Sequence, residues 1–342
     1  MFRKNALFFN IQYIYLMRKT SLSKKELRIV FMGTPDFAVD TLKAILDNGY
    51  RVVGVVTQPD KAVGRHGSIL QPSAVKKYAM RKGLPVLQPE KMKDPVFVSQ
   101  LKKLRANLQV VVAFRMLPEV VWSMPKYGTF NVHAAMLPQY RGAAPINWAI
   151  INGETTTGVT TFFLDEKIDT GRIIRQKEYK IKSNYNYGNV YNGLKRKGAE
   201  ICLETLRDIR LAAGYPKSIP QDDFNVDGVI HSAPKIFKET CEINWSWTAK
   251  QIFDFVRGLN PNPIAWTTLM DPKGKTSILK VHRVRISGLV RNLPSGTISI
   301  EEKKLYITAA NGEQVEIVEL QVPGKKKMSA RDFLNGNQDI MA

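Results

Sequence analysis

Short apolar runs alternate with amphipathic segments along the first half of the chain. Residues 27–32 (LRIVFM), 51–56 (RVVGVV) and 108–114 (LQVVVAF) are almost continuously apolar. Such runs are typical of strands that are buried on both faces of a parallel sheet. Residues 128–133 predict a further strand. Strands that alternate with helical segments predict an α/β fold with a doubly wound, Rossmann-like parallel sheet.

A helix is predicted directly after the first strand. Thr34-Pro35-Asp36 supplies a capping hydroxyl and a proline at an early helical position. Apolar residues then recur at helical spacing: Phe37, Val39, Leu42, Ile45 and Leu46. Ligands in doubly wound sheets bind at the carboxyl ends of the strands, so residues that follow each strand are candidates for a site.

The pattern changes near residue 210. Segment 211–232 contains Pro216, Pro220 and Gly228 and has no clear periodicity, which predicts a linker. Beyond it, short strand-like segments predict an OB-like β-barrel as the second domain; they lie at 243–248, 265–270, 278–286, 296–300, 305–309 and 315–322, with a helix at 249–259. The expected division is an extension (1–26), a first domain (27–210), a linker (211–232) and a second domain (233–342).

The first 25 residues differ from the rest, because they contain no Asp or Glu and their apolar run is broken by Asn10 and Gln12. The segment is too short and too polar to span a bilayer. A signal peptide, a transit peptide, a disordered tail and a true start at Met17 all stay open. The disordered tail or the later start is the favoured interpretation.

A long segment without clear periodicity, 58–77, predicts a loop inside the first domain. Such loops are functional or disordered. Its cations suit a phosphate-bearing ligand; they are Lys61, Arg65, His66, Lys76 and Lys77. A solvated loop is the alternative.

Charge favours a polyanionic partner. The 342 residues carry a formal net charge of +21, which favours nucleic acid first and an anionic membrane second. The alternative is a basic surface that only aids solubility.

Several classes of protein are disfavoured by missing motifs. Gly33-Thr34-Pro35-Asp36-Phe37 is not a GxGxxG fingerprint, and no GxxxxGK[ST] occurs, which argues against a NAD enzyme and a P-loop nucleotidase. Cys202 and Cys241 form no disulfide framework, which fits a reducing compartment. The four histidines have no metal-binding spacing, so no metal is expected.

The candidate chemistry lies in Asn131-Val132-His133 and Asp169. Side chains two apart on a strand face the same side, so Asn131 and His133 can face one pocket. An amide donor beside an imidazole suits attack on a carbonyl. A carboxylate such as Asp169 could fix the tautomer of the imidazole and support its positive charge.

Six stretches in order match one family from about residue 27 to residue 336. They are VFMGTPDFAV (30–39), VVTQPDKAVGR (55–65), VVVAFRMLP (110–118), FNVHAAMLPQYRGAAPINWAI (130–150), GVTTFFLDEKIDTG (158–171) and LQVPGKKKMSARDFL (320–334). The chain resembles the methionyl-tRNA formyltransferases. This resemblance implies transfer of a formyl group from 10-formyltetrahydrofolate to the methionine amine of initiator methionyl-tRNA. A cytoplasmic enzyme, expected to be a monomer with no membrane partner, fits it.

The resemblance also assigns residues. It makes Asn131, His133 and Asp169 the catalytic trio. The implied folate contacts are Phe114, Arg115, Met116, Leu117, Ala135, Met136, Leu137 and Pro138. Arg65 falls in the family's tRNA-binding insert, and the cations Lys61, Lys76, Lys77, Lys325, Lys326 and Lys327 are expected to contact tRNA phosphates.

The chain departs from the family at one site position. The family usually has His-x-Ser-Leu-Leu-Pro, whereas this chain has Ala135 and Met136 in the third and fourth places. Ala135 removes one hydroxyl donor, while Met136 keeps the volume of Leu. Binding should survive if main-chain groups hold the folate.

Three other functions stay open. They are formyl transfer to a small amine, such as an amino sugar or a glycinamide ribonucleotide, hydrolysis that releases formate, and RNA binding by the barrel alone. The first needs neither the +21 charge nor the basic insert. The last leaves the Asn131, His133 and Asp169 set unexplained.

Overall fold

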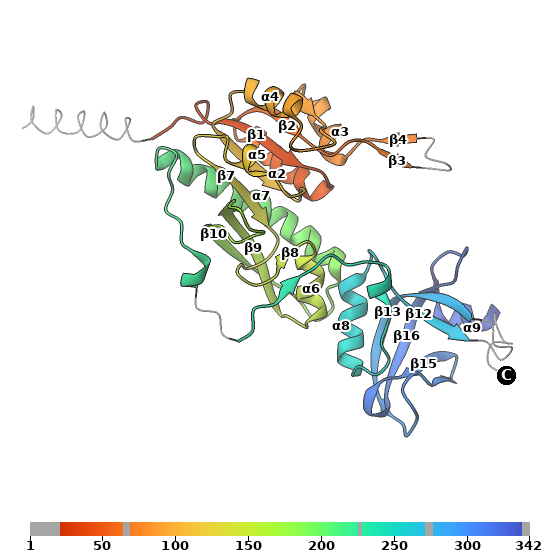
Figure 1. Cartoon of the computed structure of the whole chain (residues 1–342). Coiled ribbons are helices and arrows are strands. Elements are labelled where there is room, and N and C mark those ends of the chain that lie inside the picture. Colours follow the sequence, from red (N-terminus) through yellow and green to blue (C-terminus); the bar gives the residue numbers. More distant parts are fainter. Residues whose placement is uncertain (1–20, 64–68, 225–227, 271–275, 337–342) are drawn as a thin grey trace, which may run out of the picture. The chain divides into compact units, whose positions relative to one another are not determined.

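The computed structural model describes residues 21–63, 69–224, 228–270 and 276–336, and Figure 1 traces the chain. The chain divides into two compact units. Among the described residues, those of 21–141, 158–179 and 192–230 belong to unit 1, and those of 142–157, 180–191 and 231–336 belong to unit 2. Residues 142–157 and 180–191 thus group with the C-terminal part. The domain boundaries expected at 210 and 232 stay a prediction.

A seven-stranded sheet forms the centre of unit 1, in the order β10-β9-β7-β6-β1-β2-β5. Its strands are β1 (Arg28–Gly33), β2 (Arg51–Val56), β5 (Val86–Leu87), β6 (Leu108–Val112), β7 (Thr129–His133), β9 (Thr156–Phe163) and β10 (Ile173–Lys180). The pairs from β5 to β7 are parallel, and β9 joins β7 antiparallel. The prediction of a Rossmann-like parallel sheet is therefore confirmed.

Helices cover both faces of this sheet. On one face, Val111 of β6 belongs to a core cluster with Phe97, Leu101 and Val121, which come from α4 (Pro95–Lys103) and α5 (Glu119–Trp122). On the other face, Val132, the register partner of Val112, lies against Gly198 of α7 (Tyr187–Leu211). Because Val111 and Val112 point to opposite sides, the two helix layers lie on opposite faces.

The first helix, α2 (Asp36–Asp47), begins where predicted, but not by the predicted cap. Its N-cap is Pro35, no side chain caps it, and the buried hydroxyl of Thr34 has no hydrogen-bond partner among the described residues. The expected capping role of Thr34 is therefore wrong.

The prediction that 58–77 is a loop is wrong in part. Lys61–Val63 (β3) and Ile69–Gln71 (β4) pair as an antiparallel hairpin, and Ala74–Arg81 forms helix α3. The hydroxyl of Ser73 accepts a hydrogen bond from the backbone N–H of Lys76 and caps this helix. Three-residue strands give too short a pattern to detect from sequence. Arg65 and His66 lie outside the described residues.

Unit 2 contains an antiparallel sheet in the order β12-β13-β16-β15-β14, with β17 beside β16. The strands are β12 (Ala265–Met270), β13 (Thr276–Val290), β14 (Ile298–Glu301), β15 (Lys304–Thr308), β16 (Glu313–Gln321) and β17 (Met328–Ser329). Its helices are α6 (Pro145–Ile151), α8 (Ala249–Leu259) and α9 (Ala330–Gly336). The short elements that complete the chain are β8 (Arg141–Gly142), β11 (Ser232–Ala233), η2 (Gln221–Asp223), η3 (Glu239–Cys241) and η4 (Ala310–Gly312). The second domain was expected to be an OB-like β-barrel, and its antiparallel sheet is confirmed.

The strand predicted at 243–248 is wrong. The Oδ1 of Asn244 accepts a hydrogen bond from the N–H of Ser246, and its main-chain oxygen accepts one from the N–H of Trp247. These bonds close a turn, and Thr248 then caps α8 in a reciprocal capping box with Gln251. Local side-chain bonds thus override the β propensity of the two tryptophans.

Residues 21–26, the end of the predicted extension, are held against unit 1. The N–H of Leu22 donates to the carbonyl of Arg210, and the Nζ of Lys24 donates to the carbonyl of Asn48. The predictions for the first 20 residues lie outside the described part of the chain.

Helices α6 and α8 pack closely at Gly258. A Cβ there would lie 2.7 Å from the Cγ1 of Ile151 and 3.3 Å from the carbonyl oxygen of Asn147. We expect Gly258→Ala to destabilise the protein, because overpacking costs about 1–3 kcal/mol and outweighs the gain of about 0.8–1 kcal/mol in helix propensity. Gly336→Ala in α9, where nothing lies within 4 Å, is the control. Urea unfolding midpoints check both, and an undiminished midpoint for Gly258→Ala would contradict the packing argument.

Candidate active site

Asn131 and His133 lie at the carboxyl edge of the parallel sheet. The registers align Gly33 of β1 with Val112 of β6, and Val112 with Val132 of β7. His133 therefore stands one residue beyond a row of strand ends. This is where ligands bind in doubly wound sheets.

Both ring nitrogens of His133 have oxygen neighbours. The Nε2 lies 2.9 Å from the main-chain oxygen of Tyr140, and the Nδ1 lies 3.8 Å from an Oδ2 of Asp169. A carbonyl only accepts, so the Nε2 carries the hydrogen of that bond. The contact with Asp169 is too long for a hydrogen bond and is electrostatic. The carbonyl of Tyr140 thus fixes the tautomer, a role that the sequence suggested for Asp169.

The ring of His133 is almost completely buried, and the carboxylate of Asp169 is only 13% exposed. Phe162 packs edge-to-face against the imidazole, with ring centroids 6.4 Å apart. Low exposure strengthens the interaction between a charged imidazole and the carboxylate. The structure therefore brings two of the three predicted catalytic residues into direct contact.

Asn131 lies two residues before His133 on the same side of β7. Its Oδ1 is buried and has no hydrogen-bond partner among the described residues. Buried side-chain amides are normally satisfied, so an unpaired one calls for an explanation. A substrate group bound beside His133 would supply the missing partner.

The predicted folate segment 135–138 is fixed by hydrogen bonds from neighbouring strands. The hydroxyl of Thr160 donates to the carbonyl of Ala135 at 2.7 Å and accepts from the N–H of Leu137 at 3.1 Å. The Nε2 of Gln176 donates to the carbonyl of Leu137. Ala135, Leu137 and Pro138 are buried, so a serine hydroxyl at position 135 would be covered by protein. No sequence pattern pointed to Thr160 or Gln176, since both act across strands.

We expect Thr160→Val to loosen this segment. Valine keeps the volume but leaves the carbonyl of Ala135 and the N–H of Leu137 unpaired, which costs about 1–3 kcal/mol of stability. If segment 135–138 contacts the folate, the KM for the folate donor also rises.

Thr161→Val is the matched control, because Thr161 bonds to Thr205 on the other face of the strand. Both variants should lower the unfolding midpoint, and only Thr160→Val should raise the KM. Equal KM values in the two variants would contradict the role of Thr160.

The residues of the second predicted folate segment, 114–117, differ in how exposed they are. Leu117 is buried with a core cluster, against which Phe114 packs, whereas Met116 is 71% exposed. The guanidinium of Arg115 donates to the carbonyls of Pro89 and Glu90, and burial lowers its pKa. Arg115 therefore fixes a neighbouring loop, and Met116 is the member of this segment most open to a ligand.

The lysines predicted to contact tRNA differ in their exposure and in whether they form ion pairs. Lys61 and Lys77 of unit 1 and Lys325, Lys326 and Lys327 of unit 2 are exposed. Lys76 instead pairs with Asp60 at 2.7 Å and is only 20% exposed, and Lys327 pairs with Glu319 at 3.0 Å. The ion pair with Lys76 also lowers the pKa of Asp60.

The two cysteines are unsuited to nucleophilic catalysis. Both are buried and unpaired, and burial raises the pKa of each thiol. The thiolate is the reactive form. Within the described residues, no cluster of three His, Cys, Asp or Glu side chains has a metal-binding arrangement.

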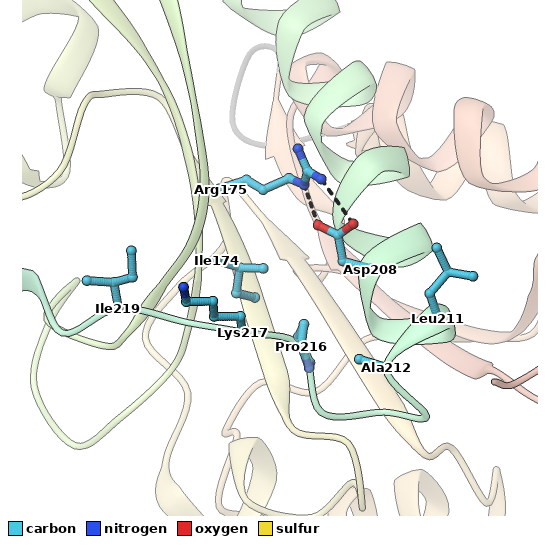
Figure 2. A pocket seen from close by; sticks show the side chains of 8 residues that line it. All are labelled: Ile174, Arg175, Asp208, Leu211, Ala212, Pro216, Lys217 and Ile219. Atoms are coloured by element: carbon cyan, nitrogen blue, oxygen red, sulfur yellow. Dashed lines mark hydrogen bonds and ion pairs between the residues drawn. The ribbon is translucent and has the colours of Figure 1, made fainter. Parts of the chain in front are cut away.

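A pocket of about 520 Å³ lies elsewhere in unit 1 and contains none of the predicted site residues. Figure 2 shows Arg175 of β10 reaching Asp208 of α7 beside it, with Ile174, Lys217 and Ile219 along another wall. Arg175 and Asp208 form an ion pair with each other, and Lys217 is the other charged side chain of the lining. Its lining contains no histidine and no side-chain amide like those at the Asn131–His133 edge.

Two family models match the chain. Residues 27–206 match the formyl transferase model, and residues 235–338 match the model of the formyl transferase C-terminal domain. Together they cover most of the chain, which therefore belongs to the formyl transferase family.

Several curated relatives of high sequence identity are methionyl-tRNA formyltransferases. The methionyl-tRNA formyltransferase of Parabacteroides distasonis is 53% identical over 93% of this chain and 98% of the relative. That of Bacteroides thetaiotaomicron is 49% identical over 92% and 97%. A solved N-formyltransferase from Helicobacter canadensis, bound to folinic acid and dTDP-3-aminofucose, aligns with a TM-score of 0.60, at 19% identity over 85% of this chain and 98% of its own. The last likeness shows the fold alone.

In the described part of the chain, no helix combines the length and the apolar character needed to cross a membrane.

Proposed function

We propose that this chain transfers the formyl group of 10-formyltetrahydrofolate to the amino group of methionine on initiator methionyl-tRNA. The observation that carries this proposal is the identity of 53% with a methionyl-tRNA formyltransferase over nearly the whole of both chains. The donor class follows from the formyl transferase family and from a structural neighbour with bound folinic acid, since folinic acid is itself a formylated folate.

The reaction forms one C–N bond and breaks another. The methionine amine attacks the formyl carbon, and negative charge develops on the formyl oxygen. The intermediate collapses as the bond to the N10 nitrogen of the folate breaks. The amine loses a proton, and N10 gains one. Two tasks fall to the protein: stabilising the oxyanion and moving the proton.

Asn131 and His133 are placed for the first task. The amide of Asn131 donates to the oxyanion, and a protonated His133 donates through its Nδ1, because its Nε2 is held by the carbonyl of Tyr140. Asp169, 3.8 Å from the Nδ1, stabilises the positive charge of that ring and relays a proton through water. No covalent enzyme intermediate is needed, in keeping with the two buried thiols.

The tRNA phosphates are bound by exposed cations. The net charge of +21 supplies a general attraction. Among the described residues, the strongest candidates are exposed lysines that form no ion pair there: Lys61, Lys77, Lys325 and Lys326. Arg65, from the resemblance, is a further candidate. Activity at subsaturating tRNA should fall steeply with salt, because bound phosphates release counterions.

One assay tests this function. Purified protein is given 10-formyltetrahydrofolate with charged initiator tRNA, an amino sugar nucleotide, glycinamide ribonucleotide, or water alone. Formylation of methionyl-tRNA at the highest kcat/KM supports the proposal. Preference for a small amine, or release of formate without an acceptor, would replace it. We further propose that the enzyme works in the cytoplasm and that it is a monomer. A size measurement on the native protein checks the second of these.

A further inference from the structure

We propose that Gln221 is a positioning residue that holds both oxygen partners of the His133 ring in place. The inference rests on the proposed function, because it concerns the same imidazole. Gln221 lies in segment 211–232, which the sequence presents as a linker, and it begins the short helix η2.

The side-chain amide of Gln221 uses all of its polar capacity in the site. Its Nε2 donates to the main-chain oxygens of Asp169, at 2.9 Å, and Gly171, at 2.8 Å. Its Oε1 accepts from the Nε of Arg141, at 3.0 Å, and from the Nη2, at 2.7 Å. Gln221 is only 4% exposed, so water is a poor substitute for these partners.

These contacts close a ring around the imidazole. From the Nε2 of His133 the path runs to the carbonyl of Tyr140, along the chain to Arg141, and through its guanidinium to Gln221. From Gln221 it returns through the main chain of Asp169 to the carboxylate beside the Nδ1. One buried amide thus links the carbonyl that fixes the tautomer to the carboxylate that stabilises the charge.

Both held residues have a backbone conformation that needs support. Tyr140 has φ 61° and Asp169 has φ 55°, in the left-handed region that non-glycine residues rarely adopt. Such residues persist where the surroundings over-determine them. Close packing adds to this, since a Cβ on Gly171 would lie 1.6 Å from the main-chain oxygen of Phe163. The turn that carries Asp169 is therefore fixed by Gln221 on one side and by β9 on the other.

The test is the kinetics of Gln221→Met, which keeps the length of the side chain and removes all four hydrogen bonds. We expect kcat for formyl transfer to fall about 10²-fold, the loss that a displacement of about 1 Å can cause. The KM values for folate and tRNA should stay within about twofold, because Gln221 touches neither substrate in this assignment. Asp222→Asn, an exposed neighbour, is the matched control and should keep wild-type kinetics.

A double mutant separates positioning from a general loss of stability. In an Asp169→Asn background, Gln221→Met should lower kcat by much less than in the wild type, because coupled residues are not additive. The full loss in that background, or a kcat of Gln221→Met within twofold of wild type, would overturn the proposal. If Gln221→Met does not fold, Arg141→Lys is tested in the same way. Lysine cannot donate two hydrogen bonds from two nitrogens to the Oε1 of Gln221, as Arg141 does.

A second readout is independent of the substrate. Nitrogen NMR of labelled histidines, of which the chain has four, reports the tautomer of neutral His133, identified by its absence in His133→Gln. We expect one tautomer, protonated at Nε2, in the wild type and a mixture in Gln221→Met. An unchanged single tautomer would overturn the proposal. If the wild type does not formylate methionyl-tRNA, the proposed function fails, while this measurement still tests the role of Gln221.

Discussion

His133→Ala should lower kcat for formyl transfer by about 10²–10⁴-fold, the usual contribution of a positioned acid or base. The imidazole is buried between the carbonyl of Tyr140 and the carboxylate of Asp169, and alanine supplies no donor at that place. Asp169→Asn should also lower kcat, because the amide cannot stabilise an imidazolium or relay a proton. The Kd for tRNA should change little in both variants, since neither group is expected to bind phosphate.

Single-turnover formylation and tRNA binding, measured on the same preparations, check this prediction. His231→Ala, which removes an exposed histidine outside the site, is the control. Formylation at near wild-type rate by either variant would remove that residue from the mechanism. A parallel fall in the unfolding midpoint would instead indicate that the buried pair is structural.

Asn131→Asp should lower kcat by about 10²–10³-fold, or about 2.7–4 kcal/mol of transition-state stabilisation, the effect of losing one oxyanion donor. The replacement has the same shape, but its carboxylate faces the developing negative charge. The buried Oδ1 of Asn131 has no hydrogen-bond partner in the described part of the chain. It can accept a hydrogen bond from the attacking amine, while the NH2 group of the same amide donates to the oxyanion. The KM for the folate donor should change less than kcat, because the interaction strengthens in the transition state.

The control is Asn192→Asp, the same change at an exposed position of α7. Steady-state kinetics, with folate and tRNA varied separately, show how much of the effect of the substitution falls on kcat and how much on each KM. A rise in the folate KM with kcat unchanged would assign Asn131 to ground-state binding and contradict its role toward the oxyanion.

The proposal that tRNA is the acceptor rests on sequence similarity and charge rather than on the fold. The solved N-formyltransferase in complex with dTDP-3-aminofucose shares this fold at 19% identity, and the proposed Asn, His and Asp chemistry would serve any amine. What favours tRNA is the full-length identity with methionyl-tRNA formyltransferases together with the net charge of +21. The acceptor assay is therefore the experiment with the most weight.

The sequence alone determined the elements whose pattern is strong. Runs such as 51–56 and 108–114 predicted buried parallel strands. The first forms with the predicted bounds, and the second ends two residues earlier, at Val112. Spacing alone also placed Asn131 and His133 on one side of a strand end. Secondary-structure predictions were wrong where local hydrogen bonds overrode β propensity, as in the turn at Asn244. They were also wrong where strands were three residues long, as in the hairpin of β3 and β4.

Only the tertiary structure decided how the site is held. The carbonyl of Tyr140, the hydroxyl of Thr160 and the amide of Gln221 reach the site across turns and strands, over sequence separations of 7, 25 and 52 residues. Periodicity reports which face of an element is buried, but it carries no information about which distant group completes a hydrogen bond there. The sequence therefore identified the candidate reactive side chains, and the fold supplied the groups that orient them.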